Sequence, residues 1–170
     1  YIPEGMVEVD AAYRYGVNML NGDADAAFRQ MADALKAEVT NEILVNFGYR
    51  SYSAIEIDYS EALVDAENDE AAVDSFMFRP GADEHQTGLA VDIVDKGRES
   101  ADFRKSRSYS WLKENSYLYG FIQRFPDRGK TLTGMEENPN WFRYVGTGAA
   151  QVIHSYNWVL EEYYYLFIGI

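Results

Sequence analysis

The alternation of apolar and polar positions along the chain predicts helices and strands in mixed order. Residues 24–36 carry apolar side chains at helical spacing, and Asp23 before them is suited to the N-cap position. Further helices are expected over residues 53–66, 108–118, 149–158 and 160–167. Short apolar runs predict strands over residues 40–47, 87–94, 121–125 and 141–145. This mixture favours an α+β domain with a small, mainly antiparallel sheet flanked by helices.

Length and composition fit one folded domain over residues 1–170, with 47% apolar residues and no internal repeat. A net charge of −13 argues against nucleic acid or an anionic membrane as a partner, since both need a basic surface. Without cysteine the chain can form no disulfide. No signal peptide or initiator Met is visible, which suggests a mature fragment. Residues 163–170 are apolar but too short to span a bilayer, and we expect a last core element there rather than a patch for something outside the chain.

The strand expected over residues 87–94 contains Asp92 as its only charge. A buried carboxylate is costly unless a cation or hydrogen-bond donors meet it. His85 lies seven residues earlier, and a turn at Thr87-Gly88 would bring its imidazole near Asp92. Histidine and aspartate are both ligands of catalytic zinc, although a pair at this spacing is more often unrelated than a metal site.

The sequence around this pair resembles that of a known family. Residues 79–93, RPGADEHQTGLAVDI, resemble the signature of the VanY-like D-alanyl-D-alanine carboxypeptidases, which are LAS-group zinc peptidases. FGYRSY at residues 47–52 is similar to the family's SGYRSY motif, and FRYVG at residues 142–146 also matches. Further matches, in order and at family spacing, occur at residues 1–4, 111–115, 119–126 and 160–163. The resemblance implies the family's single hedgehog/D,D-peptidase-like α+β domain over the whole chain.

The departures from the family pattern affect the positions of its general base and of one zinc ligand. Before FRYVG the family has Glu-Pro-Trp-His, in which Glu is the general base and His the last zinc ligand. Here Asn138 stands at the base position and Trp141 at the ligand position, with Asn140 in place of the Trp. An amide cannot take a proton from a bound water near neutral pH, and an indole offers an N–H but no metal-binding lone pair. This pattern predicts no catalytic residue at position 138, and His85 and Asp92 as the remnants of a metal site.

Other side chains could complete such a site. Asp83 replaces a substrate-contacting Ser of the family and could point toward a cation held by His85 and Asp92. Glu136 and Glu137 could reach in after a register shift. The plainer interpretation is that these three acids are solvated loop residues. The second histidine, His154, lies on a predicted helix where the family has no ligand, and we expect an ordinary packed or half-exposed side chain.

Arg50 is the main candidate for substrate binding, together with Asp83. It follows a predicted buried strand, and its planar guanidinium could bind a terminal carboxylate through two hydrogen bonds. The resemblance implies that this Arg holds the C-terminal end of the substrate. Arg50 could instead pair with a nearby acid such as Glu56 or Asp83, and an Arg50–Asp83 pair would plug the pocket. Further family positions are changed at Phe47 and Ile55. Aromatic residues 117, 119, 121, 141, 142 and 144 are expected in the core.

Three functions of different classes remain open. The first is a non-catalytic VanY-like domain that has no cofactor and binds peptidoglycan stem peptide or a protein partner through the old cleft. The second is an active zinc carboxypeptidase that removes a terminal D-Ala, with zinc on His85 and Asp92 and with Asp83 as a candidate third ligand. The third is a structural module whose pocket is filled by Trp141. The family resemblance implies a location outside the cell or at its envelope, without membrane insertion.

Overall fold

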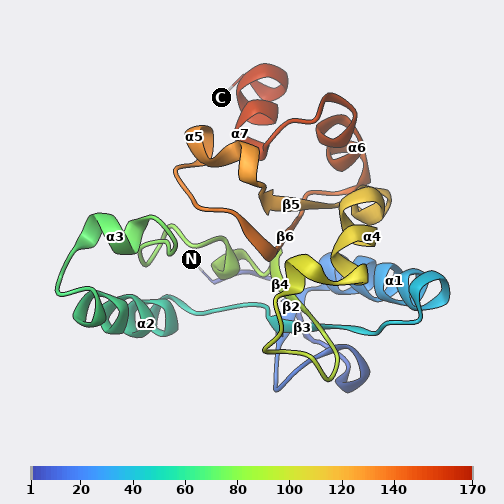
Figure 1. The fold of residues 1–170 in the computed structure, drawn as a ribbon, viewed down its shortest axis with the longest axis horizontal. Helices are drawn as coiled ribbons and strands as arrows, with labels where there is room; N and C mark the ends of the chain where they lie inside the picture. Colours follow the sequence, from blue (N-terminus) through green and yellow to red (C-terminus); the bar gives the residue numbers. More distant parts are fainter. Residues whose placement is uncertain (1, 170) are drawn as a thin grey trace.

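The computed structural model describes residues 2–169 and has a four-stranded antiparallel sheet at its centre. Figure 1 shows this sheet between helices on either side, as expected for an α+β domain. The strand order is β3-β4-β6-β5, so β4 and β6 are central. The strand bounds are β3 Ile43–Phe47, β4 Ala90–Asp95, β5 Phe121–Phe125 and β6 Asn138–Tyr144.

One face of the sheet forms the main core against α1 (Gly22–Val39) and α4 (Arg107–Asn115). Phe28 of α1 and Phe121 of β5 are both fully buried, with ring centroids 6.4 Å apart. Val91, Ile93 and Phe142 contribute to the same cluster from the two central strands. Because β-strand side chains alternate between faces, Asp92 lies on the opposite face, together with Trp141.

The helices away from this core form two further groups. In Figure 1, α2 (Tyr52–Asp65) and α3 (Glu70–Asp74) extend together to the left of the sheet. The short α5 (Lys130–Thr133) lies near α6 (Thr147–Tyr156) and α7 (Leu160–Tyr163) at the top of the same view. A π-helical turn, Tyr164–Ile168, continues α7. No helix within residues 2–169 is both long enough and apolar enough to cross a bilayer.

Most predicted elements are confirmed with small shifts at their ends, and two details were wrong. Helix α1 begins two residues earlier than expected, because Asn21 rather than Asp23 is the N-cap and accepts a hydrogen bond from the backbone N of Asp23 at 3.0 Å. Of residues 163–170, which were expected in the core, Tyr163 packs against a buried cluster, whereas every residue from Tyr164 to Ile168 is at least 42% exposed. Residue 170 lies outside the described residues.

Among the strands and α-helices of residues 2–169, four were not expected from the sequence, and one of them is the short α5. The strands β1 (Met6–Glu8) and β2 (Met19–Asn21) pair antiparallel in a separate small sheet. The third is α3, which Asp69 caps by accepting a hydrogen bond from the backbone N of Ala72 at 3.0 Å. These elements are each five residues or shorter, so they give little periodic signal.

Candidate functional site

A 3-10 turn, Glu84–Thr87, carries His85 into the structure just before β4. Gly88 ends the turn with a φ of 68°, and its backbone N donates to the carbonyl of His85 at 3.1 Å. A Cβ on Gly88 would lie 2.5 Å from the sulfur of Met6, so this position requires glycine for both its backbone angle and its close packing. The predicted turn at Thr87-Gly88 is therefore confirmed, and the strand begins at Ala90.

The turn brings His85 and Asp92 together on the face of the sheet away from the main core. The Nε2 atom of His85 lies 3.9 Å from Oδ1 of Asp92, which is too far for a hydrogen bond. Both atoms are buried and have no hydrogen-bond partner among residues 2–169. The other ring nitrogen of His85, Nδ1, lies 2.9 Å from Oδ1 of Asp83. Asp83 therefore orients the imidazole from the side opposite Asp92.

Trp141 forms one wall of this site. It is the cross-strand partner of Asp92 in the β4–β6 ladder, and its ring centroid lies 4.4 Å from that of His85. Phe78 and Phe125 pack edge-on against the indole, with ring centroids 6.0 Å and 5.1 Å away. Trp141 is only 6% exposed, so its bulk fills the space beside the histidine ring.

The side chains at and next to the family's general-base position have other partners. Asn138 begins β6, and its side-chain oxygen accepts a hydrogen bond from the backbone N of Asn140 at 3.0 Å. Glu137 forms an ion pair with Arg104 at 2.7 Å and accepts a hydrogen bond from Tyr109 at 3.2 Å. Glu136 pairs with Lys130. The register shift that would bring either glutamate to the site is therefore not seen.

Arg50 lies beside the same turn but pairs with an acid that the sequence did not single out. Its guanidinium forms an ion pair with Asp58 on α2, not with Glu56 or Asp83. Its backbone N donates to the carbonyl of His85 at 3.2 Å, which fixes the residue next to the site. The side chain keeps 25% of its surface exposed and lies over the ring of Phe47, 5.4 Å from the centroid. The Arg50–Asp83 ion pair, which would have blocked the pocket, is therefore not formed.

The donor set can be compared with what a catalytic zinc requires, which is three protein ligands and an open position. The unpartnered atoms of His85 and Asp92 face the same space and would supply two ligands. The third family position holds the indole of Trp141, and Asp83 is engaged by the other nitrogen of His85. Within residues 2–169, no group of three or more His, Asp or Glu side chains is arranged to hold a metal ion. The residues present therefore do not fit a three-ligand zinc site.

A buried ion-pair network behind the turn was missed in the sequence. Arg124 of β5 is 6% exposed and donates to Glu84 at 2.8 Å and to Glu161 of α7 at 3.0 and 2.5 Å. Arg143 of β6 donates to the hydroxyl of Thr87 at 2.9 Å. Two strands thus hold the turn that carries His85 through charged side chains. An arginine within an apolar strand segment was the available signal, but it does not identify its partners.

We expect Asp92→Asn to raise the free energy of unfolding at pH 7. Burial raises the pKa of Asp92 above its ordinary value, and this effect exceeds the opposing attraction of His85 and Arg50. The folded protein therefore binds the proton more tightly than the unfolded chain, and stability falls as pH rises from an unfolded pKa of about 3.9 through the raised folded value. Asparagine carries no charge, so its advantage is full above the folded pKa.

Urea unfolding of the parent and Asp92→Asn proteins at pH 7 and at about pH 3 measures this difference, which should vanish at the lower pH. A variant that is less stable than the parent at pH 7 would contradict the expectation, because it would mean that a cation or donor compensates the carboxylate.

Comparisons with known proteins agree with the fold and the motifs. The family model described as VanY, D-alanyl-D-alanine carboxypeptidase, matches residues 17–147. YodJ of Bacillus subtilis is 32% identical over 171 residues, which cover 96% of this chain and 62% of YodJ. A D-alanyl-D-alanine carboxypeptidase of Enterococcus faecalis is 43% identical over 93 residues, covering 55% of this chain and 34% of that protein. The chain thus spans less than two thirds of the length of these curated relatives.

Solved structures extend the likeness to three dimensions. The LD-carboxypeptidase LdcB has a TM-score of 0.86 at 31% identity, over 96% of this chain and 78% of LdcB. A zinc-bound mutant of the D,D-pentapeptidase VanY from a VanB-type resistance cassette has a TM-score of 0.80 at 30% identity, over 95% of this chain and 92% of that one. On its motifs, its fold and these similarities, the chain belongs to the VanY family of D-alanyl-D-alanine carboxypeptidases.

Proposed function

We propose that this chain is a non-catalytic VanY-type domain, extending over residues 1–170, that binds the D-Ala-terminated stem peptide of peptidoglycan. The observation that carries the proposal is the contact of Trp141 with His85, at 4.4 Å between ring centroids, at the position where the family has a zinc ligand. An indole offers the metal no lone pair, and it occupies the space that a ligand and its bound water would need. We therefore propose that the domain has no resident metal.

The proposed loss of chemistry also rests on Asn138. A general base must accept a proton from the attacking water, and an amide has no useful basicity near neutral pH. The side chain of Asn138 is already engaged with the backbone of Asn140, and the neighbouring Glu137 is held by Arg104. Asp83, which orients the imidazole, is the carboxylate in hydrogen-bond contact with the His85 ring among residues 2–169.

Arg50 supports retained ligand binding. Its backbone is fixed to the His85 turn, and its guanidinium remains a quarter exposed beside Asp58. The terminal carboxylate of a peptide could exchange with Asp58 as the partner of this guanidinium, in the bidentate geometry that arginine favours. The solved relative VanYB in complex with D-Ala-D-Ala is consistent with a ligand of this class. Such a ligand would place the domain outside the cell or at its envelope.

An active zinc carboxypeptidase is the second candidate. It is favoured by the unpartnered Nε2 of His85 and Oδ1 of Asp92, which face each other at 3.9 Å as two metal ligands would require. It needs Asp83 to release the imidazole and become the third ligand. It also needs a proton acceptor other than Asn138.

The metal content of protein purified with excess zinc separates the two candidates. We expect substoichiometric zinc and no release of D-Ala from a peptide ending in D-Ala-D-Ala. Stoichiometric zinc together with turnover would overturn the proposal in favour of the second candidate.

Calorimetric titration with the same peptide tests the retained cleft. We expect Arg50→Ala to weaken binding by about 10-fold or more, because a hydrogen bond to a charged group contributes about 1.5–3 kcal/mol. Arg79→Ala is the matched control, because Arg79 also pairs with acids, but these are Glu70 and Asp74 at the surface of α3. Equal binding by the parent and Arg50→Ala would reject peptide binding through this cleft and would favour a purely structural role for the domain.

A further inference from the structure

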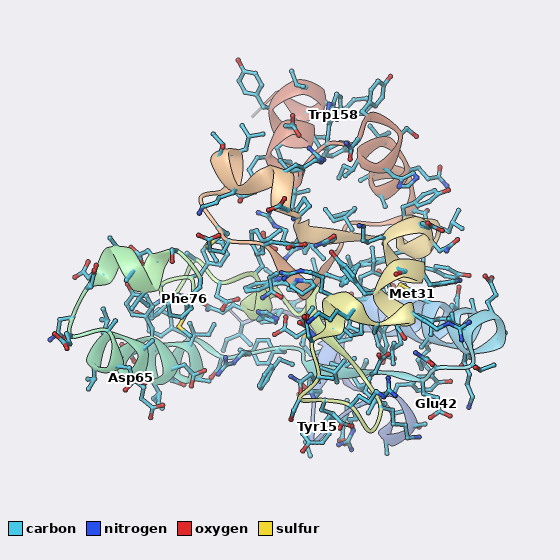
Figure 2. All side chains as sticks on the ribbon, in the orientation of Figure 1. Tyr15, Met31, Glu42, Asp65, Phe76 and Trp158 are labelled. Atoms are coloured by element: carbon cyan, nitrogen blue, oxygen red, sulfur yellow. The ribbon has the colours of Figure 1, made fainter. Side chains whose placement is uncertain are left out.

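A groove of about 550 Å³ lies at β5, the edge strand of the central sheet, apart from the site described above. Its lining comes from α4 and the 3-10 turn after it, from β5 and the chain between β5 and β6, from α6, and from the segment that joins α6 to α7. Trp158, labelled near the top of Figure 2, lies in that last segment. Neither Arg50, His85 nor Asp92 lines the groove. Its volume is in the range of small-molecule sites.

Aromatic side chains from three elements line the groove: Tyr109, Tyr117 and Trp158. Two of them are held by a second ring. Tyr117 stacks on His154 with centroids 3.7 Å apart and planes 9° apart. Trp158 stacks on Tyr156 at 4.6 Å and 17°. These stacks fix the orientation of the rings before any ligand binds, which lowers the entropy cost of binding.

Polar side chains with planar heads alternate with these rings: Gln123, Asp127, Arg128, Glu137 and Asn157. The Nε2 atom of Gln123 is buried and has no acceptor among residues 2–169, while its Oε1, 3.1 Å from the Tyr109 hydroxyl, shares that one donor with Glu137. A buried donor without a partner costs about 1–3 kcal/mol. The amide is covered in this structure, so a ligand oxygen would recover that free energy once the Gln123 side chain turns toward the groove.

The charges of the groove indicate a neutral ligand. Lys113 and Arg128 are balanced by Asp127 and Glu137, so the lining has no excess of either sign. A strongly anionic or cationic ligand would meet as much repulsion as attraction. The groove instead combines flat apolar rings with side chains that donate and accept hydrogen bonds in one plane.

From this combination we infer that the groove binds a saccharide. A pyranose ring has a face of C–H groups that can pack on an aromatic ring, and its hydroxyl groups both donate and accept hydrogen bonds. Trp158 and Tyr117 offer the rings, and Gln123 offers the buried donor. The inference does not depend on the proposed function, because the groove shares no residue with the Arg50–His85–Asp92 site.

Titration with a trimer of N-acetylglucosamine, followed by backbone amide shifts and calorimetry, tests the inference. We expect shifts around the groove, and weakening by about 10-fold or more in Trp158→Ala, as for an aromatic residue central to a binding site. Gln123→Leu removes the amide at similar size and should weaken binding by about 5-fold or more. Tyr165→Ala is the control, because this tyrosine is 74% exposed and outside the groove.

The outcomes separate this inference from the peptide-binding proposal. Sugar binding that survives Arg50→Ala, with peptide binding that survives Trp158→Ala, supports two independent sites. A glucose trimer that binds more weakly than the N-acetylglucosamine trimer assigns the ligand to amino sugars, and equal binding still supports a saccharide. No binding of either trimer, binding unchanged in both groove variants, or loss only in Arg50→Ala would overturn the inference.

Discussion

Replacing Trp141 with histidine is expected to raise the zinc affinity of this protein by about 100-fold or more, since the loss of even an outer partner of a metal ligand changes affinity 10–100-fold. Position 141 lies directly across the ladder from Asp92, so a histidine there projects onto the same face of the sheet. The indole now lies against the imidazole of His85, and its removal also frees the space for a metal. Three ligands and an open position would then be present.

Isothermal titration with zinc compares the parent and Trp141→His, with Trp111→His as the matched control. Trp111 is also buried, but it belongs to the main core and donates its N–H to Glu38 at 2.8 Å. Both variants lose packing, at a cost of about 1–3 kcal/mol that thermal unfolding will show. Only Trp141→His should gain zinc. The prediction fails if the parent already binds zinc as tightly as the variant.

Adding Asn138→Glu to Trp141→His restores a carboxylate at the general-base position. We expect this double variant, unlike either single one, to release D-Ala from a D-Ala-D-Ala peptide, because metal activation and proton removal are both needed.

Replacing Arg124 with leucine is expected to destabilise the fold by about 3–5 kcal/mol, the cost of removing one partner from a buried ion pair. Arg124 is 6% exposed and satisfies Glu84 and both side-chain oxygens of Glu161. Leucine fills part of the volume but leaves Glu84 next to Arg143, whose Nε atom also has no partner among residues 2–169. The loss should therefore reach the turn that carries His85.

Urea unfolding measures the loss, and Arg79→Leu is the control. Arg79 also pairs with two carboxylates, those of Glu70 and Asp74, but its side chain is 53% exposed. Exposed ion pairs contribute about 0–1 kcal/mol, so the control should change stability far less. Equal effects of the two variants would show that Arg124 is not buried as described. A triple variant with leucine at 124 and glutamine at 84 and 161 should recover part of the stability, because it removes the two carboxylates that lost their partner.

The sequence was sufficient for the fold class, the family and the residues that surround His85. Short-range patterns carry this information, since apolar spacing marks the elements and Gly88 marks the turn. The strand Phe121–Phe125 is confirmed with the expected bounds. His85, Asp92 and Trp141 are brought together as the motif order implied.

Side-chain pairing was not predictable, because it depends on residues far apart in the chain or on a choice among many acids. Asp58 was one of several carboxylates near Arg50 in the sequence, and only the packing of α2 decides that Asp58 rather than Glu56 meets the guanidinium. The Arg124 network joins residues 37 and 40 positions apart. The groove at β5 likewise gathers α4, α6 and the segment after it, which no local pattern brings together.

Besides the ion pairs of Arg124 and Arg143, backbone hydrogen bonds also hold the turn before β4. The carbonyl of Gly88 accepts a hydrogen bond from the N of Asn21 at 2.8 Å, and the carbonyl of His85 accepts one from the N of Arg50 at 3.2 Å. Main-chain bonds do not depend on which side chain each residue carries. Mutations at positions 85 and 141 can therefore accumulate without removing these bonds, so a lineage can exchange the chemistry of this cleft while inheriting its architecture.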